Sequence, residues 1–585
     1  MLKATSIILL ALVVFLAVSC AEAATCSASN PCSTGCCNGG VCGTGYAYCG
    51  TGCDPASGAC NGKILWGKAF TPASGIKMRV TDTVVESSGH ILVAGTLTCT
   101  ATGQTAGLTV DFYPISAWIG CDSKTFTSWF LVKLDATTKN MVWYTIGSSN
   151  DQYDEIPMGL YLYSGKAYLP VYKTATSSQS ATTWYVSGLV GISENARYIG
   201  AAHDFMRWYI MDYNVAGSDV ALSIGGFTGP AMIPTYTTFN PDTGKLYWGG
   251  QWTTTSLVFQ GSTAYSVPAR PGGATNSGRE DVWLVESDYN GANPTVRVIW
   301  SLSYSASADT DTNKGRIVLR GLSIQNQALQ FCLSSTSRGY GLNAGQLTIA
   351  VNPKLYPDDV SMESVCVTAN VPLTGYSTQI KPKLQGAYAI QGTSLYAQSF
   401  AFNTAGLVEY LGVYGSGLEF GTMKLSSPPA TYPIIGSKPF MNTTYTDYVP
   451  LTTAAKFDTA TILGSNYMLY SGLLTGSFTG NATAPLSTSV LAKGSSDILF
   501  YLWDRSVSTA VTPTPHVAFS LGQAGNTFSS YAFNATGTSA IVFSASYTSP
   551  SALTLRGYSF PSGTDTVLVG GLDFAQTTTP PPPPP

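Results

Sequence analysis

The chain has 585 residues, of which only 10% are charged, and its formal net charge is −3. A chain this long exceeds what one compact core usually supports, so several domains or a repeat architecture are expected. The small, nearly balanced charge offers no basic surface to a polyanion, which excludes nucleic acid as an expected partner. With 60 Gly and 34 Tyr, and no long stretch of apolar residues at helical spacing, the composition predicts an all-β protein of short strands and tight turns.

The first 23 residues have the organisation of a secretory signal peptide. Lys3 precedes an apolar run from Ile7 to Val18, and Ala21-Glu22-Ala23 supplies the small residues of a cleavage site. This run is short for a membrane span, and no later apolar segment approaches the roughly 20 residues that a spanning helix needs. We therefore expect cleavage after Ala23 and a secreted protein, extracellular or in a cell wall, with no membrane span. Lipid modification of Cys20 is the alternative.

The cysteines divide the mature chain into two parts. Of the 13 cysteines, eight lie between Cys26 and Cys60, and four are spread over the residues that follow. A segment as short as the first part cannot build a sufficient apolar core, so disulfides must hold it folded. The later four form two near pairs, Cys99 with Cys121 and Cys332 with Cys366, and we expect each pair to be a disulfide. The predicted domains are a signal peptide (1–23), a disulfide-rich module (24–62), a repeat body (63–575) and a Pro-rich tail (576–585).

Two strand patterns recur through the repeat body. The first is clearest from Trp129 to Gly147, where an apolar strand runs to Asp135 and a polar turn leads to a second strand with Trp143. Weaker copies cover residues 237–248, 281–300 and 497–519. The second pattern is an apolar strand of the type HILVAGTLT, found at eight places that begin at residues 90, 166, 219, 263, 328, 394, 466 and 539.

Repeated strand–hairpin units of this period predict the four-stranded blades of a large β-propeller. Eight copies favour eight blades; seven blades with one decayed repeat, or two stacked β-sandwiches, are the alternatives. Residues 64–70 and 565–574 both look like the strand that carries Trp143, so we expect them to complete one blade between them. WFLVKLDATTKNMVW resembles the β-propeller repeat family with a "D-x-F-x-x-K-x-D" strand, and this resemblance, over residues 64–575, implies a fold and no activity.

The segment from Cys26 to Cys60 resembles the hevein-type chitin-binding module. The resemblance rests on the adjacent pair Cys36-Cys37, on Cys42-Gly43, and on Tyr48-Cys49 after a gap of six residues. Spacing alone does not choose among the possible pairings of eight cysteines. The family's connectivity implies the pairs Cys26–Cys37, Cys32–Cys42, Cys36–Cys49 and Cys53–Cys60.

The same resemblance implies a sugar site in which aromatic rings lie against N-acetylglucosamine units. Asn38 stands where the family has the serine that holds the acetamide. The next positions, residues 39–41, are Gly, Gly and Val in place of two aromatics, whereas Tyr48 is kept and Tyr46 is close to it. We therefore expect Asn38, Tyr46 and Tyr48 to contact sugar. The alternative is a disulfide knot that caps or spaces the N-terminus or binds another protein.

The leading functional prediction is a secreted glycoprotein that binds carbohydrate or mediates adhesion in a cell wall or extracellular matrix. The expected partner is a polysaccharide, chitin or another glycan containing N-acetylglucosamine. Three sequons, at Asn442, Asn481 and Asn534, predict N-glycosylation. The run TTTPPPPPP at residues 577–585 predicts a stiff polyproline II stalk.

No cofactor, metal site or catalytic residue is predicted. His90, His203 and His516 are far apart in sequence and are expected at strand edges, and Asp309–Gly315 lacks the bidentate carboxylate of a calcium loop. Two functional alternatives stay open. One is a secreted propeller enzyme, a glycoside hydrolase or an oxidase, directed by the module, with acidic residues such as Asp154 and Glu155 near a central channel. The other is a structural wall protein without a specific ligand.

Overall fold

The computed structural model describes residues 36–38, 41–43, 62–100, 108–111, 116–119, 127–147, 154–173, 185–186, 204–212, 222–229, 232–252, 257–259, 265–267, 281–288, 295–304, 317–325, 328–335, 342–344, 347–349, 363–370, 383–390, 396–402, 407–414, 419–420, 423–424, 432–439, 447–450, 456–463, 467–479, 489–504, 515–537 and 539–574. Every helix or strand assigned in these ranges is a β-strand. The same ranges hold no helix of the length and apolarity needed to cross a membrane. The prediction of an all-β chain is confirmed for this part.

Seven antiparallel sheets of four or more strands form the body of the described chain. The first three sheets come in chain order, and the second has a divided first strand, β10 plus β11. Their strands are β4 (Ile76–Val85), β5 (Ile91–Cys99), β8 (Thr127–Leu134), β9 (Met141–Ile146) and β13 (Tyr185–Val186); β10 (Glu155–Pro157), β11 (Tyr161–Tyr163), β12 (Lys166–Lys173), β14 (Asp204–Asp212) and β15 (Leu222–Gly229); and β16 (Met232–Asn240), β17 (Lys245–Trp252), β20 (Asp281–Asp288), β21 (Thr295–Tyr304), β24 (Leu342–Ala344) and β25 (Leu347–Ile349).

The remaining four sheets repeat the same order of strands, and the last one recruits strands from the start of the body. Their strands are β22 (Ile317–Gln325), β23 (Ala328–Ser335), β26 (Glu363–Asn370) and β27 (Lys383–Ile390); β28 (Tyr396–Phe402), β29 (Leu407–Tyr414), β32 (Tyr432–Pro439) and β33 (Asp447–Pro450); β34 (Lys456–Leu463), β35 (Tyr467–Leu474), β38 (Asp497–Asp504) and β39 (Pro515–Leu521); and β40 (Thr527–Ala535), β41 (Ala540–Ser549), β44 (Gly563–Asp573), β3 (Lys63–Pro72), β6 (Leu108–Asp111) and β7 (Ser116–Ile119).

Short two-stranded hairpins complete the described elements. They are β1 (Cys36–Asn38) with β2 (Val41–Gly43), β18 (Leu257–Phe259) with β19 (Tyr265–Val267), β30 (Glu419–Phe420) with β31 (Met423–Lys424), β36 (Ser477–Thr479) with β37 (Ser489–Leu491), and β42 (Leu553–Leu555) with β43 (Tyr558–Phe560).

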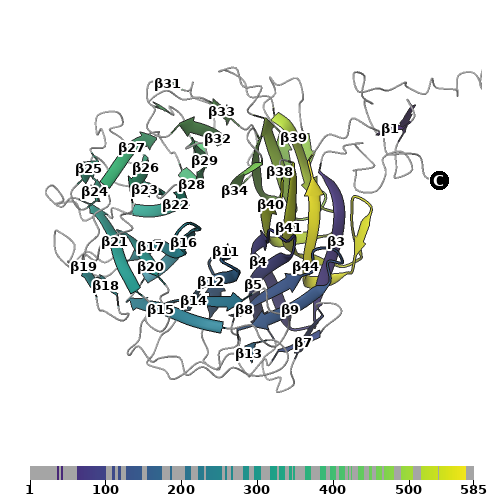
Figure 1. Ribbon diagram of the computed structural model, residues 1–585. Coiled ribbons are helices and arrows are strands. Elements are labelled where there is room, and N and C mark those ends of the chain that lie inside the picture. Colours follow the sequence, from purple (N-terminus) through teal and green to yellow (C-terminus); the bar gives the residue numbers. More distant parts are fainter. Residues whose placement is uncertain are drawn as a thin grey trace, which may run out of the picture.

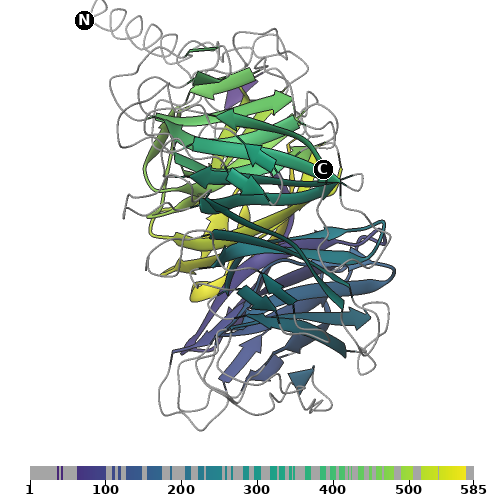
Figure 2. The ribbon, with the colours of Figure 1, turned by 90° about the vertical axis from the view of Figure 1, so that its left-hand side faces the viewer.

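The sheets are arranged side by side around a common centre (Figure 1). The first strand of each sheet, such as β4, β16, β22 or β40, lies nearest this centre, and neighbouring first strands contact one another. The view from the side shows the sheets packed face against face (Figure 2). Radial packing of four-stranded antiparallel sheets is the arrangement of a β-propeller and differs from two stacked sandwiches.

The described strands form seven such sheets, not the eight favoured by the count of apolar strands. That count mixed strands with different places in a sheet. The copy that begins at residue 219 contributes β15, the last strand of the second sheet. The copy that begins at residue 263 contributes β19 of a short hairpin, and the copy that begins at residue 394 contributes β28, a first strand. The true second strands of the third and fifth sheets are β17 and β29, whose glycines and polar residues make them less apolar than HILVAGTLT.

The expectation that the two ends of the body complete one sheet is confirmed. Strand β3 pairs antiparallel with β44, with Lys63 opposite Asp573 and Phe70 opposite Val567. Strand β44 also pairs with β41 on its other side, so the end of the body is a middle strand of its sheet. The ring is therefore closed by hydrogen bonds between its first and last long strands.

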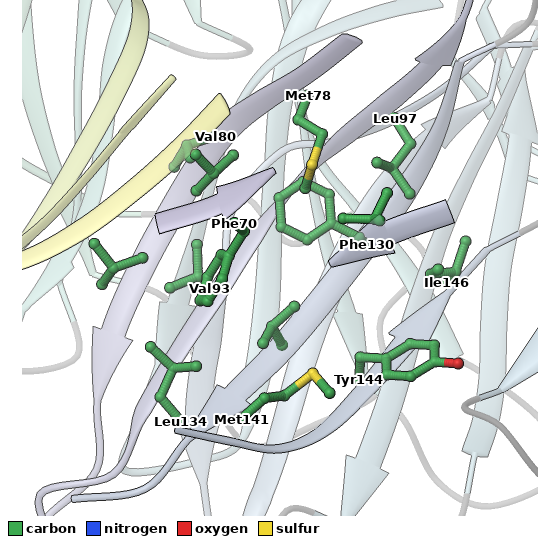
Figure 3. Close-up of a cluster of buried hydrophobic side chains, with 14 of the residues drawn as sticks. Phe70, Met78, Val80, Val93, Leu97, Phe130, Leu134, Met141, Tyr144 and Ile146 are labelled. Carbon is green, nitrogen blue, oxygen red and sulfur yellow. The ribbon is translucent and has the colours of Figure 1, made fainter. Parts of the chain in front are cut away.

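Apolar side chains fill the spaces between the sheets from both faces of each strand. In β5, Ile91 and Val93 belong to the cluster between the first and seventh sheets, whereas Leu92 and Ala94 belong to the cluster between the first and second. Figure 3 shows part of the former cluster, in which Phe70, Val80 and Phe130 come from three different strands. Because both faces are buried, these strands are continuous apolar runs and do not alternate apolar with polar residues.

The repeated third strand carries a buried charge that is paired in each of two sheets. WFLVKLD and VWLVESD occupy matching strands, and Lys133 and Glu286 hold the same position in them. The Lys133 ammonium lies 2.9 Å from Glu86, and the Glu286 carboxylate lies 2.7 Å from Lys245. The two pairs have opposite polarity but both join the third strand to the preceding hairpin. A buried charge needs such a partner, so the sign can change while the pairing is kept.

Six of the first strands contain a one-residue bulge. The extra residue, which has no partner on the second strand, is polar in every one of them, and the residue before it is apolar or proline. These axial bulge residues are Thr81, Thr235, Arg320, Gln398, Asp458 and Ser529. A bulge bends the strand and turns a side chain to a new direction, and bulges are common beside functional sites.

Glycine on the second strand makes room for the bulge. Gly95 and Gly250 lie opposite the residue that precedes the bulge, and a Cβ there would overlap the carbonyl oxygen of Arg79 or of Ile233. Gly412 and Gly472 hold the same register position in the fifth and sixth sheets. A close backbone approach of this kind is a reason for glycine within a strand.

We predict that Gly95→Ala destabilises the body, because the new methyl group overlaps a backbone carbonyl that cannot move without disrupting β4. The expected loss is about 1–3 kcal/mol of unfolding free energy, measured by denaturant unfolding. Gly537→Ala is the matched control, since no atom lies within 4 Å of a Cβ at that position. Its effect should stay within about 0.5 kcal/mol. Equal stability of the two variants would contradict the assigned role of Gly95.

Candidate functional site

The residues expected to bind sugar lie mostly outside the described ranges. Asn38 is the last residue of β1 and pairs with Val41 at the start of β2, but its side chain is not described. Tyr46 and Tyr48 are both outside the described residues. The same hairpin places Cys37 opposite Cys42 and Cys36 opposite Gly43. The sugar site of the module therefore stays a prediction.

The cysteines of the repeat body are described in part. Cys99 and Cys332 are both disulfide-bonded. Cys366 on β26 lies directly opposite Cys332 on β23, as the expected pair requires, while Cys121 falls outside the described residues. Of the module's cysteines, Cys36, Cys37 and Cys42 lie on β1 and β2, and Cys26, Cys32, Cys49, Cys53 and Cys60 are outside the described residues. The pairings themselves remain predictions.

Of the three glycosylation sequons, only the one at Asn534 is described. Asn534 is half-buried near the end of β40, and Thr536 is exposed in the turn that follows. Asn442 and Asn481 lie outside the described residues. Asn534 is thus at a strand end beside an exposed turn, where sequons are commonly found.

Of the acidic residues and histidines considered for chemistry, Asp154, Glu155 and His90 have described side chains, whereas His203 lies outside the described residues and the side chain of His516 on β39 is not described. Glu155 is fully buried in β10, whereas Asp154 is exposed and accepts a hydrogen bond from the Thr127 amide at 2.9 Å. His90 lies at the start of β5, between Glu86 at 3.9 Å and Asp135 at 3.7 Å. Within the described ranges, no three His, Cys, Asp or Glu side chains are grouped so that they could hold a metal ion.

The axial bulges place one polar residue on each of six first strands, and the first strands lie nearest the centre of the ring (Figure 1). Thr81, Thr235, Arg320 and Ser529 are all half-buried, although they stand in the middle of their strands. By contrast, the middle residues of β5, β8, β41 and β44 are almost all buried. Solvent therefore reaches the first strands at the bulges, which makes this belt of residues the candidate functional site.

Asp82, next to the bulge residue Thr81, is a titratable group beside this belt whose pKa is shifted. Its carboxyl accepts hydrogen bonds from the Thr83 amide and, across the boundary between two sheets, from the Leu160 amide, both at 2.7 Å. The residue keeps some solvent contact, but its carboxyl is enclosed, and this burial raises the pKa of Asp82 to about 6. The two backbone hydrogen bonds oppose the shift. A carboxyl with such a pKa changes charge close to neutral pH.

The Leu160 amide is available to Asp82 because the first strand of the second sheet is interrupted. Three residues, 158–160, separate β10 from β11, and they lie opposite only two residues of β12. One of those two is Pro170, which has no N–H to offer the ladder, although its carbonyl accepts a bond from the Met158 amide at 2.8 Å. The released Leu160 amide then turns to the neighbouring sheet.

Tyr161 continues the same belt toward the third sheet. Its hydroxyl donates to the Thr237 carbonyl at 2.7 Å, and the Thr237 hydroxyl donates to the Met158 carbonyl at 2.9 Å. Burial, helped by the nearby Asp82, raises the pKa of Tyr161. The ring stacks on Phe239 with centroids 5.6 Å apart. Tyr161 is thus a neutral donor that fixes the second sheet to the third.

Sequence reasoning missed this belt. Its residues lie one per repeat, separated by tens of positions, and a single polar residue inside a strand carries no motif. The recoverable signal is an apolar–polar pair in the first strand followed by glycine in the next, as in Val80-Thr81 with Gly95 and Pro234-Thr235 with Gly250. The repeat has to be aligned by strand order before that signal is visible.

Comparison with known proteins adds little to this geometry. No protein-family model matches the chain, and no curated protein matches it significantly. Among solved structures, one similar chain is the intramolecular trans-sialidase from Ruminococcus gnavus in complex with oseltamivir carboxylate. The identity is 10%, the alignment covers 86% of this chain and 96% of that one, and the TM-score is 0.32. A TM-score this low supports no conclusion about chemistry.

We predict that Asp82 makes the body less stable as pH rises. Because its folded pKa of about 6 exceeds the ordinary aspartate value of 3.8, its contribution is fully present below pH 3.8 and is lost as pH rises through 6. Between pH 4 and pH 7 the wild type should lose about 1–3 kcal/mol of unfolding free energy relative to Asp82→Asn.

The pH dependence of Asp82→Asn should therefore be flatter than that of the wild type in thermal unfolding scans. Asp135→Asn is the control. Hydrogen bonds from the amides of Thr138 and Thr137 lower the pKa of Asp135, so its contribution is present above the unfolded pKa and is lost only as pH falls below it. That variant should keep the wild-type slope between pH 4 and pH 7. A wild-type slope in Asp82→Asn would contradict the assignment.

Proposed function

We propose that this chain is an extracellular carbohydrate-binding protein in which residues 24–62 bind a chitin-type glycan and the repeat body presents that module. The observation that supports the proposal is the pairing of β1 with β2. It sets Cys36 and Cys37 on one strand across from Cys42 on the other, with Asn38 at the end of the hairpin. A hairpin of two three-residue strands is unstable alone. Disulfides from the cysteines of both strands would give it the rigidity that sugar binding needs.

The side chains expected at this site suit an N-acetylated sugar. The amide of Asn38 both donates and accepts hydrogen bonds, as the acetamide group of the ligand requires. Tyr48 supplies a flat ring for the apolar face of the sugar, and its hydroxyl can remain in contact with water. With one stacking ring kept from the family pattern, each module binds weakly, and several copies on one surface would strengthen attachment.

An oxidising, extracellular environment is supported by the disulfides of the body. Cys99 and Cys332 lie on β5 and β23, in different sheets, and both are disulfide-bonded. Structural disulfides persist in secreted proteins and are rare in the reducing cytosol. This agrees with the expected signal peptide and with the glycosylation predicted at Asn534.

We predict that the full-length secreted protein is retained on insoluble chitin and that Tyr48→Ala reduces this retention about tenfold, because the stacking ring is lost. The measurement is the bound fraction at increasing amounts of chitin. Tyr558→Ala, which removes a half-buried tyrosine of β43, is the control and should bind as the wild type does. Equal retention of Tyr48→Ala would remove Tyr48 from the site. No retention of the wild type would favour the disulfide knot.

A further inference from the structure

The first and seventh sheets meet near the centre of the ring through hydroxyl groups. The Val80 amide donates to the Ser546 hydroxyl at 3.0 Å, and the hydroxyls of Thr83 and Ser544 are hydrogen-bonded to each other. These contacts join β4 to β41, and β4 also lies beside β40. Each of these four groups has a partner, so they account for the attachment of the two sheets.

Three further hydroxyls on β4 and β40 have no such role. The side-chain oxygens of Thr81, Ser529 and Ser530 are buried and have no hydrogen-bond partner among the described residues. Two of them belong to the axial bulge residues, and the third follows directly in β40. A buried hydroxyl without a partner costs about 1–3 kcal/mol, so three such groups on β4 and β40, two strands in contact, require a reason.

Solvent reaches these residues even though their oxygens are turned inward. Thr81, Ser529 and Ser530 are half-buried as residues, in contrast to the buried middle strands beside them. A rotation about one side-chain bond moves a serine or threonine hydroxyl between staggered positions without moving the backbone. Because the inward position leaves the hydroxyl unsatisfied, a ligand that offers a partner on the solvent side gains free energy from the rotation.

The chemistry of the belt fits a neutral ligand rich in hydroxyl groups. Sugar hydroxyls donate and accept, which matches the hydroxyls of serine and threonine. A bound metal ion is a poor fit, since no metal-holding group of carboxylates, histidines or cysteines occurs in the described part of the chain. The bulges supply the geometry, because they place the hydroxyls on the strands nearest the centre.

We propose that the axial bulges of the first and seventh sheets form a second carbohydrate site, in which the hydroxyls of Thr81, Ser529 and Ser530 bind the hydroxyl groups of a neutral sugar. This inference deepens the proposed function and rests on it, since it takes the same class of ligand. Two sites of different position on one chain would allow it to hold two glycan strands, or two parts of one strand, at the same time.

The test is a titration of the full-length protein with N,N′,N″-triacetylchitotriose and with cellotriose, followed by calorimetry. The variants are Thr81→Val and Ser529→Ala in the belt and Tyr48→Ala in the module. Thr83→Val is the matched control. It removes a hydroxyl from the same strand as Thr81, but this hydroxyl is already hydrogen-bonded to that of Ser544. We expect Tyr48→Ala to lose binding at the module and to retain binding at the belt. Each belt variant should weaken the affinity of the belt for the sugar about three- to tenfold.

Thermal unfolding separates loss of binding from loss of folding. Thr81→Val and Ser529→Ala remove unsatisfied hydroxyls, so their melting temperatures should equal or exceed that of the wild type. Thr83→Val should melt lower, because it leaves Ser544 unpaired, yet bind as the wild type does. This pattern distinguishes a ligand site from a structural contact.

The remaining outcomes contradict one proposal or both. If both belt variants bind like the wild type, the belt hydroxyls are served by water alone and the second site is overturned. If Tyr48→Ala abolishes all binding, the second site fails while the proposed function stands. If only the belt variants lose binding, the second site stands and the module site fails. If the wild type binds neither trisaccharide, both proposals fail.

Discussion

The pairing of β3 with β44 is the interaction on which the ring depends. It joins residues from the two ends of the repeat body, Lys63 with Asp573 and Phe70 with Val567, and so fixes the seventh sheet against the first. The same strand pair supplies side chains to both neighbouring cores, since Ile64 and Leu568 belong to one cluster and Phe70 and Val567 to the other. Loss of this pairing would expose apolar surface on both sides at once.

Closure of this kind has a consequence for folding. The partners are separated by about 500 positions, and bringing chain ends together has an entropy cost that contacts recover only after they form. Contacts between such distant residues slow folding, so the seventh sheet should be completed late, when the sheets between its two ends are in place. The sheets within the ring, by contrast, are built mostly from neighbouring hairpins.

The belt of bulges depends on this closed ring. At the sheet boundaries, polar groups close to the bulges are satisfied by the neighbouring sheet. Asp82 receives the Leu160 amide from the second sheet, Ser546 receives the Val80 amide, and Thr237 receives the Tyr161 hydroxyl. Polar contacts across three boundaries therefore hold the first strands in register with one another. The hydroxyls of Thr81, Ser529 and Ser530, by contrast, have no hydrogen-bond partner among the described residues.

Much of the fold could be predicted from the sequence because burial on both faces leaves long apolar runs. HILVAGTLT and WFLVKLD are such runs, and they became β5 and β8. The two ends were matched correctly because Ile64–Phe70 and the last strand share one apolar pattern. Eight sheets were favoured and seven were an alternative, and the count was one too high because apolar first, last and hairpin strands were counted together with second strands. KLYWGGQW was overlooked as the second strand of its sheet, since Gly249 and Gly250 lower its apolar character for a steric reason visible only in three dimensions.

The candidate site was less predictable than the fold for a physical reason. A bulge is defined by register between two strands, and register depends on hydrogen bonds that no single strand encodes. Thr81 and Ser529 lie hundreds of positions apart, yet they share the boundary between β4 and β40.

The module, in contrast, is predicted from local cysteine spacing, and its chemistry does not depend on the ring. Since β3 begins at Lys63, opposite Asp573 near the end of β44, residues 24–62 and 576–585 both connect to the ring at the same end of this strand pair. The strand pair that closes the ring is therefore also the attachment point of both.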